Sequence, residues 1–185
     1  MSTSKYSALS DEKLMELFIG DRQPIYFTTL YNRYFSSLCK YMTWLTTDMN
    51  KSQDFAQNIL LKIYHRPELF DSTQSFKPWL FTIARNHWKN DIRDQSTQIK
   101  HLALYKSIVN TSSTTTNSDH KEQFKAIQNA IKLLSDTHKE IIILKYSNNL
   151  TIPEISSILN CSKGTVKSRL FYALKHLRKL LIPQS

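Results

Sequence analysis

The sequence predicts an all-α protein of two small helical domains joined by a flexible linker. Three observations favour this fold class. The 185 residues include only 2 glycines and 5 prolines, too few turn-forming residues for a many-stranded sheet protein. Apolar residues recur at helical spacing in two separate blocks. An almost purely polar stretch lies between them, at residues 107–121.

We therefore expect a first domain at residues 10–95, a linker at residues 96–121 and a second domain at residues 122–185. The polar residues of the linker cannot bury enough apolar surface to offset the entropy lost on ordering.

Composition narrows the classes of protein further. Hydrophobic residues make up 41% of the chain, so disorder throughout is not expected. The net charge of +10 predicts attraction to a polyanion without saying which one. No run of about 18 apolar residues occurs, so we expect no membrane insertion. Two isolated cysteines, Cys39 and Cys161, fit a reduced, cytoplasmic protein.

The first block indicates four consecutive helices. Ser10 has the position of an N-cap before the first apolar repeat. Residues 25–45 are rich in aromatic side chains at helical spacing, which favours core packing over a stacking surface. Residues 54–65 form the third helix. After a turn-rich stretch, Pro78 suits the first turn of a fourth helix that ends near Asp94.

The second block predicts four more helices, at residues 122–134, 137–146, 151–159 and 162–181. The last two have the spacing of a helix-turn-helix. Ile155 and Leu159 would face inward from the first helix of the motif, and Val166 and Leu170 from the second.

Polar side chains remain on the outside of the second helix of this motif. Hydroxyl, ammonium and guanidinium groups near a helix N-terminus suit contacts with phosphates and with the major groove of duplex DNA. From Lys163 to Lys179 there are six basic residues and no acidic one. A solvated basic face is the alternative, but the turn and the core spacing favour DNA binding. The candidate DNA-binding residues are Ser162, Lys163, Thr165, Lys167, Ser168 and Arg169.

Two segments resemble extracytoplasmic-function (ECF) sigma factors of the sigma-70 family. The segment Ser75-Phe-Lys-Pro-Trp-Leu-Phe-Thr-Ile-Ala-Arg-Asn is similar to the promoter-melting segment of that family. Gly164-Thr-Val-Lys-Ser-Arg-Leu, followed by Ala173-Leu and Leu177-Arg, is typical of its second domain. The resemblance covers nearly all of residues 18–181 except the linker. It implies a subunit that binds core RNA polymerase, recognises the −35 and −10 promoter elements, and supports promoter melting and transcription initiation.

The resemblance also implies where polymerase binds. The helix that begins at Asp54 is similar to the surface that contacts the clamp coiled coil of the largest polymerase subunit. Its outward residues would be Asp54, Gln57, Asn58 and Leu61. Family members often carry an acid near Asn58, so this interface is either less charged or depends more on Asp54. The alternative is a helix that exposes amides to water.

The loop at residues 67–77 and the helix after it resemble the part that recognises the −10 element. Opened DNA needs aromatic rings that stack on bases and cations that follow the backbone. Core packing is the alternative for Phe76 and Trp79, and Asn86 alternatively braces the loop. The family often places an acid where Asn90 stands. The candidates are Phe76, Lys77, Trp79, Arg85, Asn86, Trp88, Lys89 and Arg93.

Signatures of catalysis are absent from the sequence. It has no glycine-rich phosphate loop, no metal-ligand spacing among its six histidines and no evident acid–base pair. We expect no enzyme activity and no cofactor. The expected partners are core RNA polymerase and promoter DNA; relatives commonly have an anti-sigma factor as well. Two alternatives stay open: a dimeric regulator that binds operators without polymerase, and a helical protein that binds membrane surfaces.

Overall fold

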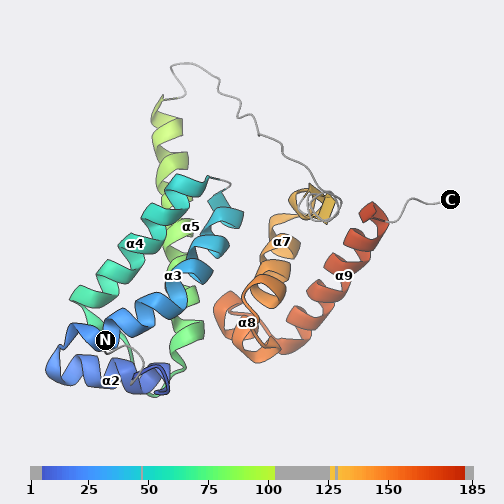
Figure 1. Cartoon of the computed structure of the whole chain (residues 1–185). Coiled ribbons are helices and arrows are strands. Elements are labelled where there is room, and N and C mark those ends of the chain that lie inside the picture. Colours follow the sequence, from blue (N-terminus) through green and yellow to red (C-terminus); the bar gives the residue numbers. More distant parts are fainter. Residues whose placement is uncertain (1–5, 47, 103–125, 128, 182–185) are drawn as a thin grey trace.

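The computed structural model of the chain describes residues 6–46, 48–102, 126–127 and 129–181. Every regular element within these ranges is a helix, which confirms the predicted all-α class (Figure 1). None of the described helices is long and apolar enough to cross a membrane.

Four α-helices and one short 3-10 helix follow one another in the described part of the first block. They are α2 (Asp11–Asp21), α3 (Pro24–Thr46), α4 (Met49–His65), η1 (Pro67–Leu69) and α5 (Phe76–Leu102). Ser10 is the N-cap of α2, as predicted, and its hydroxyl accepts a hydrogen bond from the backbone N–H of Lys13 at 3.2 Å. Pro78 lies in the first turn of α5, as expected.

Two helices of this block are longer than predicted. Helix α4 begins five residues before the expected start at Asp54, because the Asp48 carboxylate caps it and accepts the N–H groups of Asn50 and Lys51 at 2.9 and 3.1 Å. Helix α5 continues to Leu102 instead of ending near residue 94. Its last turns therefore include residues 96–102, which we expected to begin the linker. They contain no glycine or proline that would stop a helix. The rest of the expected linker, residues 103–121, lies outside the described residues.

The second block contains α7 (Asp136–Ile142), the π-helical segment η2 (Ile143–Ser147), α8 (Ile152–Leu159) and α9 (Lys163–Leu181). The helix expected at residues 137–146 corresponds to α7 and η2 together. Residues 126–127 and 129–132 of the helix expected at 122–134 are helical, whereas residues 122–125 and 128 lie outside the described residues.

The aromatic segment of α3 forms much of the first block's core. Tyr41 is fully buried, and Tyr26, Phe27 and Tyr34 are almost fully buried. This confirms the prediction that the regularly spaced aromatic residues of this segment pack in the core. The two blocks touch: α5 packs against α8 and α3 against η2, so the buried side chains form one connected cluster.

Candidate nucleic-acid and polymerase interfaces

Helices α8 and α9 form the predicted helix-turn-helix. Thr151 and Glu154 make a capping box at the start of α8: Thr151 donates its N–H to the Glu154 carboxylate at 2.6 Å, and its hydroxyl accepts the Glu154 N–H at 3.4 Å. Asn160 adopts a left-handed conformation, with φ of 50°, and ends α8. Ile155 and Val166 are fully buried. The motif is therefore held at its start, its turn and its core.

The N-terminal turn of α9 is exposed and basic. Ser162 caps this helix: its hydroxyl accepts the Thr165 N–H at 3.0 Å and lies 2.9 Å from the Thr165 hydroxyl. Lys163, Lys167 and Ser168 are exposed, whereas Thr165 and Arg169 are half-buried. Since the Ser162 hydroxyl already caps the helix, the cations and the helix dipole are the groups best placed to bind phosphate.

The segment between η1 and α5 forms an exposed loop with fixed ends. All five residues of 71–75 are exposed. Asp71 accepts hydrogen bonds from the backbone N–H and the hydroxyl of Thr73, at 2.9 and 2.8 Å. These bonds hold the pKa of Asp71 below the usual value of an aspartate, the backbone N–H having the larger effect. A charged Asp71 thus closes the first turn of the loop.

Phe76 lies in the core, and the expectation that it stacks on unpaired bases is wrong for this structure. Its side chain is fully buried, with its ring centroid 5.4 Å from those of Tyr34 and Phe70 and 5.6 Å from that of Trp79. Trp79 is half-buried and contacts Phe70 edge-on at 4.9 Å. The core alternative therefore holds for Phe76, because its ring packs against Tyr34 of α3 and against Phe70 and Trp79.

Arg85 forms an ion pair with a residue of the second block. Its side chain is only 15% exposed, and Nε donates to Glu140 Oε1 in α7 at 2.8 Å. The buried Tyr41 hydroxyl donates to the same oxygen at 3.0 Å. Burial and the nearby Glu140 charge raise the pKa of Tyr41 well above its ordinary value. Contact between Arg85 and DNA would compete with this ion pair.

The remaining candidates on α5 differ in exposure. Asn86, Lys89 and Arg93 are exposed and recur at intervals of three and four residues, so they share one face of the helix. Lys77 and Trp88 are half-buried. One polar face of α5 therefore carries exposed amide and cationic side chains of the kind that contact a nucleic-acid strand.

The face of α4 expected to bind polymerase is open. Asp54, Gln57 and Asn58 are exposed, and Leu61 is 52% exposed. The opposite face, which includes Phe55 and Ile59, is buried. This arrangement gives α4 a mixed polar and apolar surface available to another protein.

Three residues near these surfaces were not identified from the sequence. Met49 is 69% exposed at the start of α4, and an earlier helix start at the Asp48 cap would have indicated it. Glu12 and Glu140 contact residues far away in the chain, and no local pattern points to such pairs. Within the described ranges, no three His, Cys, Asp or Glu side chains are arranged to hold a metal ion.

Comparison with known families agrees with the two-block organisation. Residues 30–98 match the family described as Sigma-70 region 2, and residues 124–177 match Sigma-70, region 4. The ECF RNA polymerase sigma factor SigL of Mycobacterium tuberculosis is 30% identical over 161 residues, which cover 82% of this chain and 86% of SigL. SigW of Bacillus subtilis, also an ECF RNA polymerase sigma factor, is 30% identical over 144 residues, covering 72% of this chain and 77% of SigW.

Solved structures share the fold. The sigma factor RpoE of Bartonella quintana, in complex with the anti-sigma factor NepR, matches with a TM-score of 0.68 and 24% identity over 85% of this chain and 98% of RpoE. CnrH, in complex with the cytosolic domain of CnrY, matches with a TM-score of 0.70 and 19% identity over 95% of this chain and 99% of CnrH.

Proposed function

This chain belongs to the ECF group of the sigma-70 family of RNA polymerase sigma factors, and we propose that its two blocks bind different parts of a promoter. The first block, residues 10–95, binds core polymerase and holds the −10 element after the strands separate. The second block, residues 122–185, binds duplex DNA at the −35 element.

One observation supports this division above all others. Regions 2 and 4 match in order on the two helical blocks, and each block exposes a surface suited to its proposed DNA form. The basic start of α9 suits duplex DNA. The exposed loop 71–75 and the polar face of Asn86, Lys89 and Arg93 suit a separated strand.

Polymerase binding is proposed for α4. Its face of Asp54, Gln57, Asn58 and Leu61 is exposed, and contact with the clamp coiled coil would add a helix to this face. Catalysis would belong to the polymerase, and the complex would act in the cytoplasm. Because RpoE was crystallised with an anti-sigma factor, we also propose that an anti-sigma partner binds this chain.

Promoter binding would separate the two blocks. The −35 and −10 elements lie about 25 base pairs apart, or roughly 85 Å along a duplex. This distance is about twice the length of α5, whose 27 residues span about 40 Å. Blocks that touch through Arg85 and Glu140 cannot occupy both elements, so binding to polymerase and DNA must break this ion pair.

Run-off transcription with core polymerase on genomic DNA tests the proposal. We expect transcripts from defined start sites that depend on the added chain. Gel shifts with and without core enzyme separate this function from that of a dimeric regulator, which would bind palindromic DNA tightly on its own. A chain that neither binds core enzyme nor directs any defined start would refute the proposal.

A further inference from the structure

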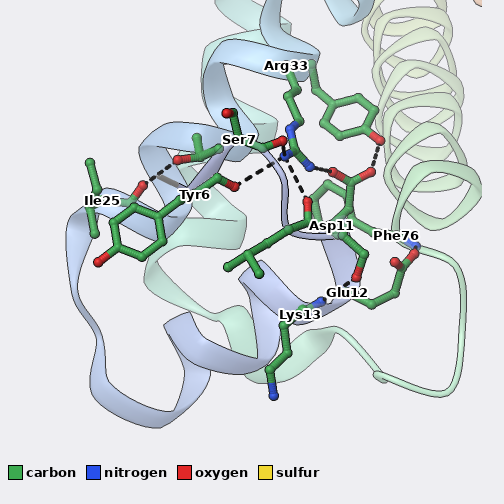
Figure 2. Close-up of polar contacts among 12 residues, drawn as sticks. Tyr6, Ser7, Asp11, Glu12, Lys13, Ile25, Arg33 and Phe76 are labelled. Carbon is green, nitrogen blue, oxygen red and sulfur yellow. Dashed lines mark hydrogen bonds and ion pairs between the residues drawn. The ribbon is translucent and has the colours of Figure 1, made fainter. Parts of the chain in front are cut away.

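The first backbone N–H of α5 is hydrogen-bonded to a side chain from α2. Phe76 donates its N–H to Glu12 Oε1 at 2.9 Å, although the two residues are 64 positions apart in sequence (Figure 2). The first N–H groups of a helix have no acceptor within the helix. A carboxylate at this place satisfies one of them and interacts favourably with the helix dipole.

Glu12 is itself held firmly, because the neighbouring Asp11 is fixed to α3. The Asp11 carboxylate accepts a hydrogen bond from Arg33 at 2.5 Å and another from the Tyr34 hydroxyl. Arg33 also donates to the carbonyl oxygens of Ser7 and Leu9, at 2.7 and 2.9 Å (Figure 2). The start of α2 is thus joined to α3 on one side and to α5 on the other.

The segment that Glu12 fixes is the one proposed to hold the opened −10 strand. Phe76 directly follows the exposed loop 71–75, whose other end is closed by the Asp71 turn. Phe76 also packs on Tyr34 and Trp79. The loop is thus held by hydrogen bonds at both of its ends.

We propose that Glu12 is a positioning residue for recognition and opening of the −10 element. The inference rests on the proposed function of the first block and extends it to α2, because Glu12 lies outside residues 30–98, which match region 2. Glu12 acts through the backbone of Phe76: it holds the start of α5, and hence the loop before it, in the position that a separated strand requires. Small displacements of a supporting group are enough to weaken such a site.

The test compares variants in the polymerase holoenzyme at a promoter identified by run-off transcription. Glu12→Ala removes the acceptor, and Glu12→Asp keeps the charge but shortens the side chain by one methylene. Glu16→Gln is the matched control, because Glu16 lies on the same helix in an exposed ion pair with Lys13. Three quantities are measured: affinity for core polymerase, the rate of strand opening from permanganate reactivity of −10 thymines, and the preference for the promoter over versions substituted in the −10 element.

We expect Glu12→Ala to lower the opening rate and the −10 preference by on the order of tenfold, the usual effect of losing a hydrogen bond to a charged group. Core affinity should stay within about twofold of the wild type. Glu12→Asp should show a smaller loss of the same kind, and Glu16→Gln none. A merely structural role would lower core affinity and opening together and leave the −10 preference unchanged.

Unchanged opening and preference in folded Glu12→Ala would overturn the inference, as would a loss of core affinity that accounts for the whole defect. If Glu12→Ala does not fold, Glu12→Asp decides, and wild-type opening and preference in that variant would overturn it. Failure of the wild-type holoenzyme to start transcription would instead refute the proposed function, whatever the Glu12 variants do.

Discussion

Glu140→Ala should weaken the contact between the two blocks by about 2–4 kcal/mol. The substitution removes two hydrogen bonds, from Arg85 at 2.8 Å and from Tyr41 at 3.0 Å. It leaves the Tyr41 hydroxyl in a fully buried site and the Arg85 guanidinium without its anion. Breaking a buried ion pair by removing one partner costs about 3–5 kcal/mol. Because the Arg85 side chain keeps 15% exposure and can turn toward water, we place the cost lower.

Tryptophan fluorescence can report this effect selectively. All three tryptophans, Trp44, Trp79 and Trp88, lie in the first block, whereas Glu140 lies in the second. Urea unfolding followed by fluorescence therefore measures the first block, and Glu140→Ala should lower its midpoint although the change is elsewhere. Asp136→Ala is the control, because this exposed acid is in the first turn of the same helix. We expect it to cost at most about 1 kcal/mol, through the helix dipole of the second block.

Equal fluorescence midpoints for the two variants would refute the reasoning. The Arg85–Glu140 contact would then contribute nothing to the stability of the first block in solution. Tyr41→Phe gives a finer measure: it removes one hydroxyl and keeps the ion pair, so it should lower the free energy of unfolding by only about 1 kcal/mol.

Three further outcomes are expected. Phe76→Ala should lower the free energy of unfolding by about 3–5 kcal/mol in urea titrations, because Phe76 is fully buried. Phe171 is 63% exposed, so Phe171→Ala should lower it by less than about 0.5 kcal/mol. Arg169→Ala should weaken holoenzyme binding to promoter DNA by about 1–3 kcal/mol if Arg169 recognises a base, and should weaken binding to scrambled DNA equally if it only holds phosphate. Burial, then the charges of His176 and Arg169, lower the pKa of His138. The contribution of His138 to the free energy of unfolding of the second block should therefore be complete above the ordinary histidine pKa of 6.5 and should be lost as the pH drops below it.

Each of these has a result that would count against it. A Phe76→Ala variant as stable as Phe171→Ala would return Phe76 to the list of candidate base-stacking residues. No change with either DNA would remove Arg169 from the −35 surface. His138→Gln should flatten the dependence of unfolding on pH, followed by circular dichroism of the whole chain beside tryptophan fluorescence, which reports the first block alone. An unaltered slope would assign the pH dependence to another group.

Local patterns explain what the sequence could predict. The cap at Ser10 was found because an N-cap hydroxyl binds an N–H three residues later, a distance that is visible in sequence. The start of α4 was placed too late although Asp48 offers the same signal, because the apolar repeat used to find that helix begins only at Phe55. Helical periodicity locates the core face and does not locate the helix end.

Contacts between distant segments explain what the sequence could not predict. Phe76 and Trp79 are both aromatic and three residues apart, and only the contact of Phe76 with Tyr34, which is far away in the sequence, shows that Phe76 is the fully buried one. Arg85 pairs with an acid 55 residues away in the other block. Composition and spacing indicate only that Arg85 is a cation on the outside of its helix. Such a cation can bind either a DNA phosphate or the Glu140 carboxylate, so the sequence does not distinguish the two partners.

Loss of the Arg85–Glu140 pair should lower the stability of the chain and raise its affinity for the separated −10 strand. Binding that requires the blocks to separate is weakened by the free energy of their contact. A contribution of about 2–4 kcal/mol corresponds to a factor of roughly 30 to 1,000 in the equilibrium between touching and separated blocks. Glu140→Ala should therefore lower the urea midpoint and yet raise the affinity of the free chain for a single-stranded −10 oligonucleotide, measured by fluorescence anisotropy, since Arg85 is released. General destabilisation would lower both quantities, and an unchanged affinity in the folded variant would show that Arg85 does not contact the strand.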